Sequence, residues 1–437
     1  MIYLLFVVLL LGLFLSYILT NRDILSCSVI GHAVYLLSTF VLVLNYDDLC
    51  YDISFNTVCI IEGSLLFLFI GEFIGRNNTY TPTSNNVVKL PIIKISKSNF
   101  ILYICVLVLN TFYSYYRFNY VGSVLGGGNF VSKYMFVRSY LTTEEGVRGL
   151  DSISVPYSSM FSYLQFFATG IFFTFVFVYF YMLFFKSIKD KRLLISLLIY
   201  VPVLLFSTTR SIFINTISIS SIIIFLLFIQ SHKGLNVYRL NKKIIKWGLI
   251  ALVSFFVIFV GVGSLKEQDV LGNTGGIMTG YAGASIIGLD QYVEGKIEAK
   301  SDYPGQVTLE GLVSFLNHFG FDHKLASYHQ DDFTYGNNVS NIFAAPYYML
   351  RDFPIPIMLL IHLGWGVIIS YLISKIKNYR VPQYLPYNYI IVGYLYYPVV
   401  MLPITDAFRH IIGMPFFYTI ISLLIIQKYL IKKSLYF

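Results

Sequence analysis

The chain alternates between long apolar runs and shorter polar connections from one end to the other. A transmembrane helix needs about 20 predominantly apolar residues to cross roughly 30 Å of hydrocarbon. Runs near this length predict eleven spans, at residues 2–19, 26–44, 57–75, 99–117, 158–185, 193–206, 211–229, 247–264, 354–374, 387–403 and 413–430. The first run lacks a basic start and a cleavage site, so we expect it to remain as a span. The pattern predicts an all-α polytopic membrane protein with a single integral-membrane domain, residues 1–437.

Basic residues divide the connections into two classes. The first class holds 20 of the 31 lysines and arginines and comprises residues 20–25, 76–98, 186–192, 230–246, 375–386 and 428–437. The second class holds 18 of the 22 acidic residues and comprises residues 45–56, 118–157, 207–210, 265–353 and 404–412. Cytoplasmic loops are enriched in lysine and arginine. We therefore expect the first class and the C-terminus to be cytoplasmic and, with eleven spans, the N-terminus to lie outside.

The same alternation predicts a tight turn at Ser207–Arg210. Both flanking loops, 186–192 and 230–246, are basic, so the chain must cross the membrane twice between them. The first of these two spans has only 14 residues, which rise about 21 Å. A turn sunk below the surface is tolerated only within protein or beside a wet cavity. We expect Arg210 to point into the protein near the outer headgroup level.

Two connections of the second class are long enough to carry structure of their own, residues 118–157 and 265–353. If the orientation holds, both are periplasmic loops. The larger one contains the periodic segments GIMTGYAGASIIGLDQYVEG and TLEGLVSFLNHFGFDHKLASY, which predict amphipathic helices that lie on the membrane or cap a cavity.

Composition narrows the class of protein further. The chain is 57% hydrophobic and 12% charged, whereas soluble domains are about one quarter charged. The net charge of +9 comes from lysines and arginines beside spans, which favours a membrane protein over a nucleic-acid-binding one. The four cysteines form no metal-binding or disulfide pattern. We therefore expect no metal, no cofactor and no nucleic-acid partner.

A few arginines stand at the mouths of spans in the second class of loops. The planar guanidinium fork suits phosphate oxygens, and a lipid-linked diphosphate would lie at this level of the outer leaflet. Such arginines could hold the diphosphate and stabilise it as a leaving group. The candidates are Arg138, Arg210, Arg351 and Arg409. The alternative is snorkelling, or pairing with acids as in Arg351–Asp352 and Asp406–Arg409; the turn of Arg210 contains no acid.

A general base would be needed to take a proton from a sugar hydroxyl, and histidine suits this near pH 7. The candidates are His318, His323, Asp331 and His410. Three histidines, His318, His323 and His329, are spaced by five and six residues, which does not fit a helical metal pair. Glu62 and Glu72 lie within the third predicted span, and acids inside a membrane suggest a proton or ion pathway as a further hypothesis.

Two short stretches resemble the O-antigen polymerases of the Wzy type. They are STTRSIF at the predicted turn and GNNVSNIFAAPYYMLRDF over residues 336–353. The pattern of spans and of one moderate and one large loop is similar over most of the chain. Some members carry an Arg-x10-Gly pattern, which Arg138 and Gly149 match, whereas the second copy has lysine at Lys300 before Gly311.

The resemblance implies an enzyme of the bacterial inner membrane with its active face in the periplasm. Such enzymes transfer a growing glycan from undecaprenyl diphosphate to an incoming lipid-linked repeat unit, without a metal. Their fold is similar to that of the C-type glycosyltransferases and O-antigen ligases. The implied partners are the undecaprenyl-diphosphate-linked oligosaccharides, membrane lipids and a chain-length regulator protein.

Three other functions remain as alternatives. A lipid-linked oligosaccharide flippase would need charged residues along a path through the spans and shorter outer loops. A membrane O-acyltransferase would need a catalytic histidine near the cytoplasmic half, where His232 is the single candidate. An O-antigen ligase would share the fold and differ in its acceptor.

Overall fold

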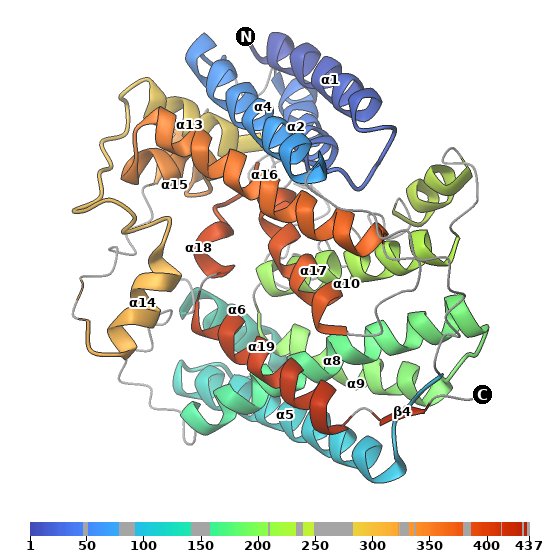
Figure 1. Cartoon of the computed structure of the whole chain (residues 1–437). Helices are drawn as coiled ribbons and strands as arrows, with labels where there is room; N and C mark the ends of the chain where they lie inside the picture. Colours follow the sequence, from blue (N-terminus) through green and yellow to red (C-terminus); the bar gives the residue numbers. More distant parts are fainter. Residues whose placement is uncertain are drawn as a thin grey trace.

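The protein is described by a computed structural model, which is mostly helical (Figure 1). The described residues are 1–46, 51–77, 92–140, 158–208, 210–232, 239–248, 283–321, 323, 332–335, 338–378, 386–411, 413–430 and 432–434. The N-terminal half contains α1 (Ile2–Leu19), α2 (Cys27–Leu44), α4 (Phe55–Asn77), β1 (Ile92–Lys94), α5 (Lys97–Val124), α6 (Phe130–Tyr140), α8 (Ser158–Lys186), α9 (Lys191–Phe206) and α10 (Arg210–Ser231). The C-terminal half contains α13 (Ala284–Val293), α14 (Glu310–His318), β2 (Phe333–Tyr335), β3 (Asn338–Ser340), α15 (Ala345–Asp352), α16 (Ile355–Asn378), α17 (Pro386–Met401), α18 (Phe408–Ile411), α19 (Met414–Ile425), η2 (Ile426–Leu430) and β4 (Lys432–Ser434).

Seven helices in the described part of the chain are long and apolar enough to cross a membrane: α1, α2, α4, α5, α8, α10 and α16. The shorter helices α9, α17 and α19 coincide with three more of the predicted spans. The predicted span 247–264 lies almost wholly outside the described residues. The protein is thus a multi-pass helical membrane protein, and the count of eleven spans stays a prediction.

The lysine-rich connections meet at one end of the helices, which we call the basic end. Asp23, after α1, binds Arg76 at the end of α4 (2.9 Å) and Lys377 at the end of α16 (2.6 Å). Asn241 donates to the carbonyl of Arg22 (2.6 Å). Strand β1 pairs antiparallel with β4 near the C-terminus. The described parts of all these loops therefore share one end, as the charge pattern predicts.

The acid-rich connections meet at the opposite end, the acidic end, on the left of Figure 1. The N-terminal amine pairs with Asp52. Asp290 of α13 accepts hydrogen bonds from the amide of Ser54 (2.7 Å) and the hydroxyl of Thr57 (2.8 Å), so it caps the start of α4. Ser285 of α13 donates to the carbonyl of Pro403 after α17. The long loop thus folds onto the ends of the spanning helices.

The two predicted amphipathic segments form helices of different character. Residues 284–291 of α13 are all buried, so this helix belongs to the core instead of lying on the surface. In α14, Val313 is buried and Phe315 packs on Phe417 with ring centroids 4.6 Å apart, whereas Ser314 is exposed. Only α14 therefore has the two-sided pattern that the sequence predicts for both.

The chain reverses direction between α9 and α10, at the predicted turn. Phe206 at the end of α9 packs on Phe118 at the acidic end (5.7 Å between centroids). Gln230 at the end of α10 donates to the carbonyl of Ile376 at the basic end. Between the helices, Thr208 has a φ of +54°, a left-handed conformation that is uncommon for residues other than glycine. Thr208 itself is buried, at only 1% exposed.

Helices α4 and α16 form the closest helix pair. A Cβ atom on Gly71 would lie 2.0 Å from the carbonyl oxygen of Leu363, and one on Gly366 would lie 2.3 Å from that of Leu68. Small residues allow such approach in membrane helices, where packing rather than hydrophobic exclusion drives association. Helices α15, α1 and α2 all pack against this pair.

Candidate functional site

The short helix α15 lies at the acidic end, directly before the spanning helix α16. It begins at Ala345 with Pro346 in its first turn, where the fixed φ of proline suits a helix start and no amide proton is needed. The Ala345 amide donates to the carbonyl of Leu402, 2.8 Å away. The start of α15 is therefore attached to the end of α17.

Arg351 stands at the end of α15, one helical turn after Tyr347. Its guanidinium lies 5.7 Å from the centroid of the Tyr347 ring, and Nη1 is 3.5 Å from the Tyr347 hydroxyl. A cation over an aromatic face is attracted by the ring quadrupole. The spacing of four residues in α15 thus positions this predicted arginine.

Arg409 reaches the next tyrosine of the same helix from α18. Its guanidinium lies 5.3 Å from the centroid of the Tyr348 ring, and Nη1 is 3.8 Å from Oε2 of Glu310 in α14. Arg351 and Arg409 therefore contact neighbouring tyrosines, although they are far apart in sequence. We call Tyr347, Tyr348, Arg351, Arg409 and Glu310 the α15 cluster.

The acids beside these arginines have other tasks. Asp352 is buried and accepts hydrogen bonds from the amides of Val307 (3.1 Å) and Thr308 (2.6 Å) and from the hydroxyl of Ser301. It therefore holds the 301–309 segment against α15. These contacts indicate that Asp352 mainly binds the 301–309 segment, and not that it mainly neutralises Arg351.

Asp406 lies in the loop between α17 and α18 and is fully buried. Its Oδ1 accepts a hydrogen bond from the Phe408 amide (2.9 Å), and Oδ2 has no hydrogen-bond partner among the described residues. Burial raises the pKa of Asp406 to about 7, although the nearby positive charge of Arg409 acts in the opposite direction. The carboxyl is therefore held largely neutral below this pH, and it is not a simple ion-pair partner of Arg409.

This raised pKa predicts that stability depends on pH. The ordinary value is 3.8, so between about pH 4 and 7 the carboxyl is protonated in the folded protein and ionised in the unfolded one. The contribution to stability is complete below pH 4 and declines as pH rises through about 7, by up to roughly 1.4 kcal/mol per pH unit. Melting temperatures measured in detergent from pH 5 to 8 should fall less in Asp406→Asn than in the unchanged protein. If the melting temperatures of the two proteins fall equally between pH 5 and 8, the prediction is wrong.

The other two arginine candidates belong to elements that meet at the same end. Arg138 lies in the last turn of α6, and the hydroxyl of Tyr134 in this helix donates to the Thr208 carbonyl in the turn between α9 and α10 (3.5 Å). Arg210 is the first residue of α10, and its side chain lies outside the described residues. Ile214, one turn later, packs with the cluster that contains Ala407, two residues before Arg409.

The base candidates are described only in part. The His323 side chain is exposed, its backbone is held by Asn317 through two hydrogen bonds of 2.7 and 2.9 Å, and its ring lies 6.1 Å from that of Tyr303. His318 ends α14 and His410 lies in α18, but their side chains are outside the described residues. Asp331 is outside them entirely.

The structure adds residues that the sequence did not single out. Tyr347 could have been found, because its spacing of four from Arg351 in APYYMLRD puts both on one helix face. Tyr348 and Glu310 meet Arg409 through tertiary packing. No local pattern in the sequence would have indicated that contact.

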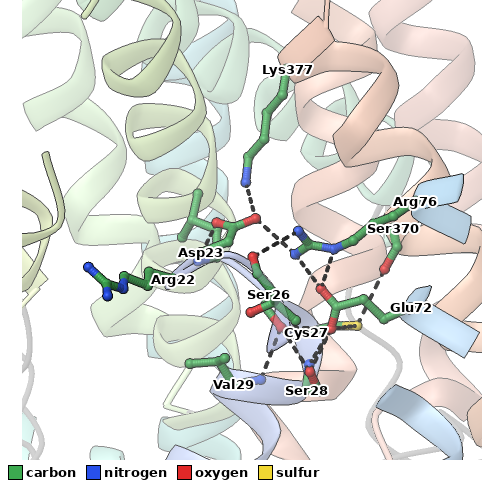
Figure 2. A network of polar contacts seen from close by, with 12 residues as sticks. Arg22, Asp23, Ser26, Cys27, Ser28, Val29, Glu72, Arg76, Ser370 and Lys377 are labelled. Atoms are coloured by element: carbon green, nitrogen blue, oxygen red, sulfur yellow. Dashed lines mark hydrogen bonds and ion pairs between the residues drawn. The ribbon is translucent and has the colours of Figure 1, made fainter. Parts of the chain in front are cut away.

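A second polar network lies at the basic end (Figure 2). The buried Glu72 carboxylate accepts from the Ser26 hydroxyl (2.7 Å), from the amide and hydroxyl of Ser28 (3.0 and 2.6 Å), and from Arg76 (Nε at 2.9 Å). Burial would raise the pKa of Asp23, but Lys377 and Arg76 hold it below the ordinary value. This network therefore joins α1, α2, α4 and α16, and its satisfied donors indicate a structural role for Glu72 instead of an ion pathway.

Among the described residues, no group of three or more His, Cys, Asp or Glu side chains could hold a metal ion. The α15 cluster therefore remains the candidate site, on the strength of its own geometry. No protein-family model, no curated protein and no solved structure matches this chain.

Proposed function

We propose that this protein is a glycosyltransferase that polymerises undecaprenyl-diphosphate-linked oligosaccharide repeat units, as the O-antigen polymerases do. The observation that carries the proposal is the α15 cluster, in which Arg351 and Arg409 lie on adjacent tyrosines outside the spanning helices. Two guanidinium groups this close to a span mouth suit a lipid-linked diphosphate. The proposal places the acidic end in the periplasm of a Gram-negative bacterium, the C-terminus in the cytoplasm and the protein in the inner membrane.

The chemistry asks two things of the protein. The bond between the first sugar carbon and the diphosphate oxygen breaks, and the acceptor hydroxyl oxygen forms the new glycosidic bond. Arg351 and Arg409 neutralise the charge that grows on the departing lipid diphosphate, with Arg138 and Arg210 as further contributors. A base takes the hydroxyl proton, and we retain His318, His323, Asp331 and His410 as candidates. Tyr347 and Tyr348 position the two guanidinium groups.

The folded elements at the acidic end favour an enzyme over a flippase. Helices α13, α14, α15 and α18 all lie outside the candidate spans and pack on their ends. An acyltransferase would use His232 at the basic end. Nδ1 of this histidine lies 2.7 Å from the Ser231 hydroxyl and 3.0 Å from the Phe228 carbonyl, so its contacts are with its own helix. An O-antigen ligase would use the same site with a different acceptor, so the acceptor must be tested directly.

Reconstitution provides that test. Purified protein in lipid vesicles, given undecaprenyl-diphosphate-linked repeat units alone, is expected to form a ladder of longer glycans on the lipid carrier, with or without a metal chelator. Deletion of the gene is expected to collapse the cellular ladder to core plus one unit. If vesicles yield product only when lipid A-core is added, the protein is a ligase. If they only move the substrate across the bilayer, it is a flippase.

A further inference from the structure

An imidazole and a carboxylate face each other inside the spanning helices, away from the α15 cluster. His32 lies in α2 and Glu62 in α4, and Nε2 of His32 is 3.9 Å from Oε2 of Glu62. The two side chains are 7% and 21% exposed, respectively. Ionisable groups at such positions are costly in a membrane and are commonly functional.

A backbone carbonyl determines the tautomer of His32, and therefore which ring nitrogen carries the lone pair. Nδ1 lies 2.7 Å from the Ser28 carbonyl oxygen, which can only accept a hydrogen bond. Nδ1 therefore carries the hydrogen, and in the neutral ring Nε2 is an acceptor. If Glu62 is deprotonated, its carboxylate is a second acceptor facing Nε2. Two acceptors that face each other have room for one added proton. One added proton can be held by either atom and attracted by the other.

The surroundings keep the pair together and leave the carboxyl without another donor. Oε1 of Glu62 is buried without a hydrogen-bond partner among the described residues. Helix α1 covers the imidazole at Gly12, where a Cβ atom would lie 2.4 Å from Nε2. A side chain at this position would displace the ring. The glycine thus permits α1 to close over the pair.

Several other ionisable groups on α4 or on helices packed against it contact partners other than Glu62. The Tyr35 hydroxyl of α2 donates to the Leu402 carbonyl (3.2 Å), and Asp290 of α13 caps the start of α4. On α16, Nδ1 of His362 lies 2.9 Å from its own Met358 carbonyl, and its ring faces Phe408. At the basic end, Glu72 is paired with Arg76. Among the described residues, His32 is the basic side chain that lies within 4 Å of the Glu62 carboxylate.

We propose that His32 and Glu62 form a proton-binding site within the membrane, which takes up one proton on Nε2 of His32 or on Oε2 of Glu62. A proton fits this pair better than a metal cation, because hard cations require several oxygen ligands and the pair offers one carboxylate. The site goes beyond glycosyl transfer at the acidic end, which needs no proton inside the bilayer. Ser28 also connects it to the basic end, because its carbonyl holds His32 while its amide and hydroxyl hold Glu72.

Labelling with dicyclohexylcarbodiimide, a hydrophobic reagent that reacts with protonated carboxyl groups, tests the proposal. The full chain in lipid vesicles is treated at pH 5 to 9, and modification is located by mass spectrometry. Glu62 should be labelled, and its labelling should decline as pH rises. Glu72 is the internal control and should stay unlabelled, because its carboxylate oxygens are engaged by Arg76, Ser26 and Ser28.

Two variants separate the pair from a merely exposed carboxyl. Glu62→Gln should abolish the label, and the variant should still unfold in one cooperative thermal transition. His32→Gln removes one of the two atoms that attract the added proton, so the labelling midpoint should move to lower pH by about 1 unit. Absence of Glu62 labelling, labelling independent of pH, or a profile unchanged in His32→Gln would each overturn the proposal.

Discussion

Replacing Glu72 with alanine is expected to destabilise the protein by about 3–5 kcal/mol, the usual cost of removing one member of a buried ion pair. Glu72 is only 1% exposed and receives the donors of Ser26 and Ser28 at the start of α2. Without its carboxylate, these donors lose their acceptor and Arg76 keeps only part of its compensation. The contacts that join α1, α2, α4 and α16 at the basic end would then be weakened.

The effect can be measured as a fall in the midpoint of thermal or denaturant unfolding in detergent. Asp190→Ala provides a control, because it removes a partly exposed carboxylate that pairs with the exposed Arg192 at 2.8 Å. Asp190 also caps the start of α9, which adds about 0.5–2 kcal/mol to the expected loss. Surface pairs contribute about 0–1 kcal/mol. Equal losses in the two variants would show that burial of the Glu72 network does not matter, contrary to our interpretation.

Apolar periodicity and loop charge predict much of the architecture for a physical reason. A bilayer requires long apolar helices and penalises polar backbone, so the sequence of each span carries its own signal. The turn at Thr208 was predictable because basic loops on both sides demand two crossings. The meeting of Asp23 with Lys377, 354 residues apart, was not, because it depends on how α16 packs against α4.

The candidate site shows the same division. Its arginines could be selected because basic residues are sparse in the acid-rich loops, where these arginines stand at the mouths of spans. Their partners could not, since adjacent acids in the sequence need not be partners in space. Asp352 follows Arg351 directly yet binds the amides of Val307 and Thr308, while Arg409 reaches Glu310. Residue type thus selected the arginines as candidates, whereas their partners depend on the tertiary packing around α15.

Alanine at Arg351 or at Arg409 is expected to reduce glycan polymerisation by about 10²–10³-fold, as loss of one charge-stabilising donor does in other enzymes. Each substitution removes a group that would neutralise the departing diphosphate. Lysine keeps the charge but loses the planar fork, so Arg351→Lys and Arg409→Lys should recover only part of the rate. The rate is followed as ladder formation in vesicles from defined lipid-linked units.

Folding defects must be separated from lost chemistry, because Arg409 also contacts Glu310 and Tyr348. Each variant is therefore compared at equal amounts of folded protein, judged by its melting temperature. Arg192→Ala at the basic end removes an exposed arginine, 63% accessible, and should leave the rate unchanged. If folded Arg351→Ala and Arg409→Ala both polymerise at the rate of Arg192→Ala, the α15 cluster does not hold the diphosphate. A specific loss at both positions, partly restored by lysine, would instead place the leaving group between α15 and α18.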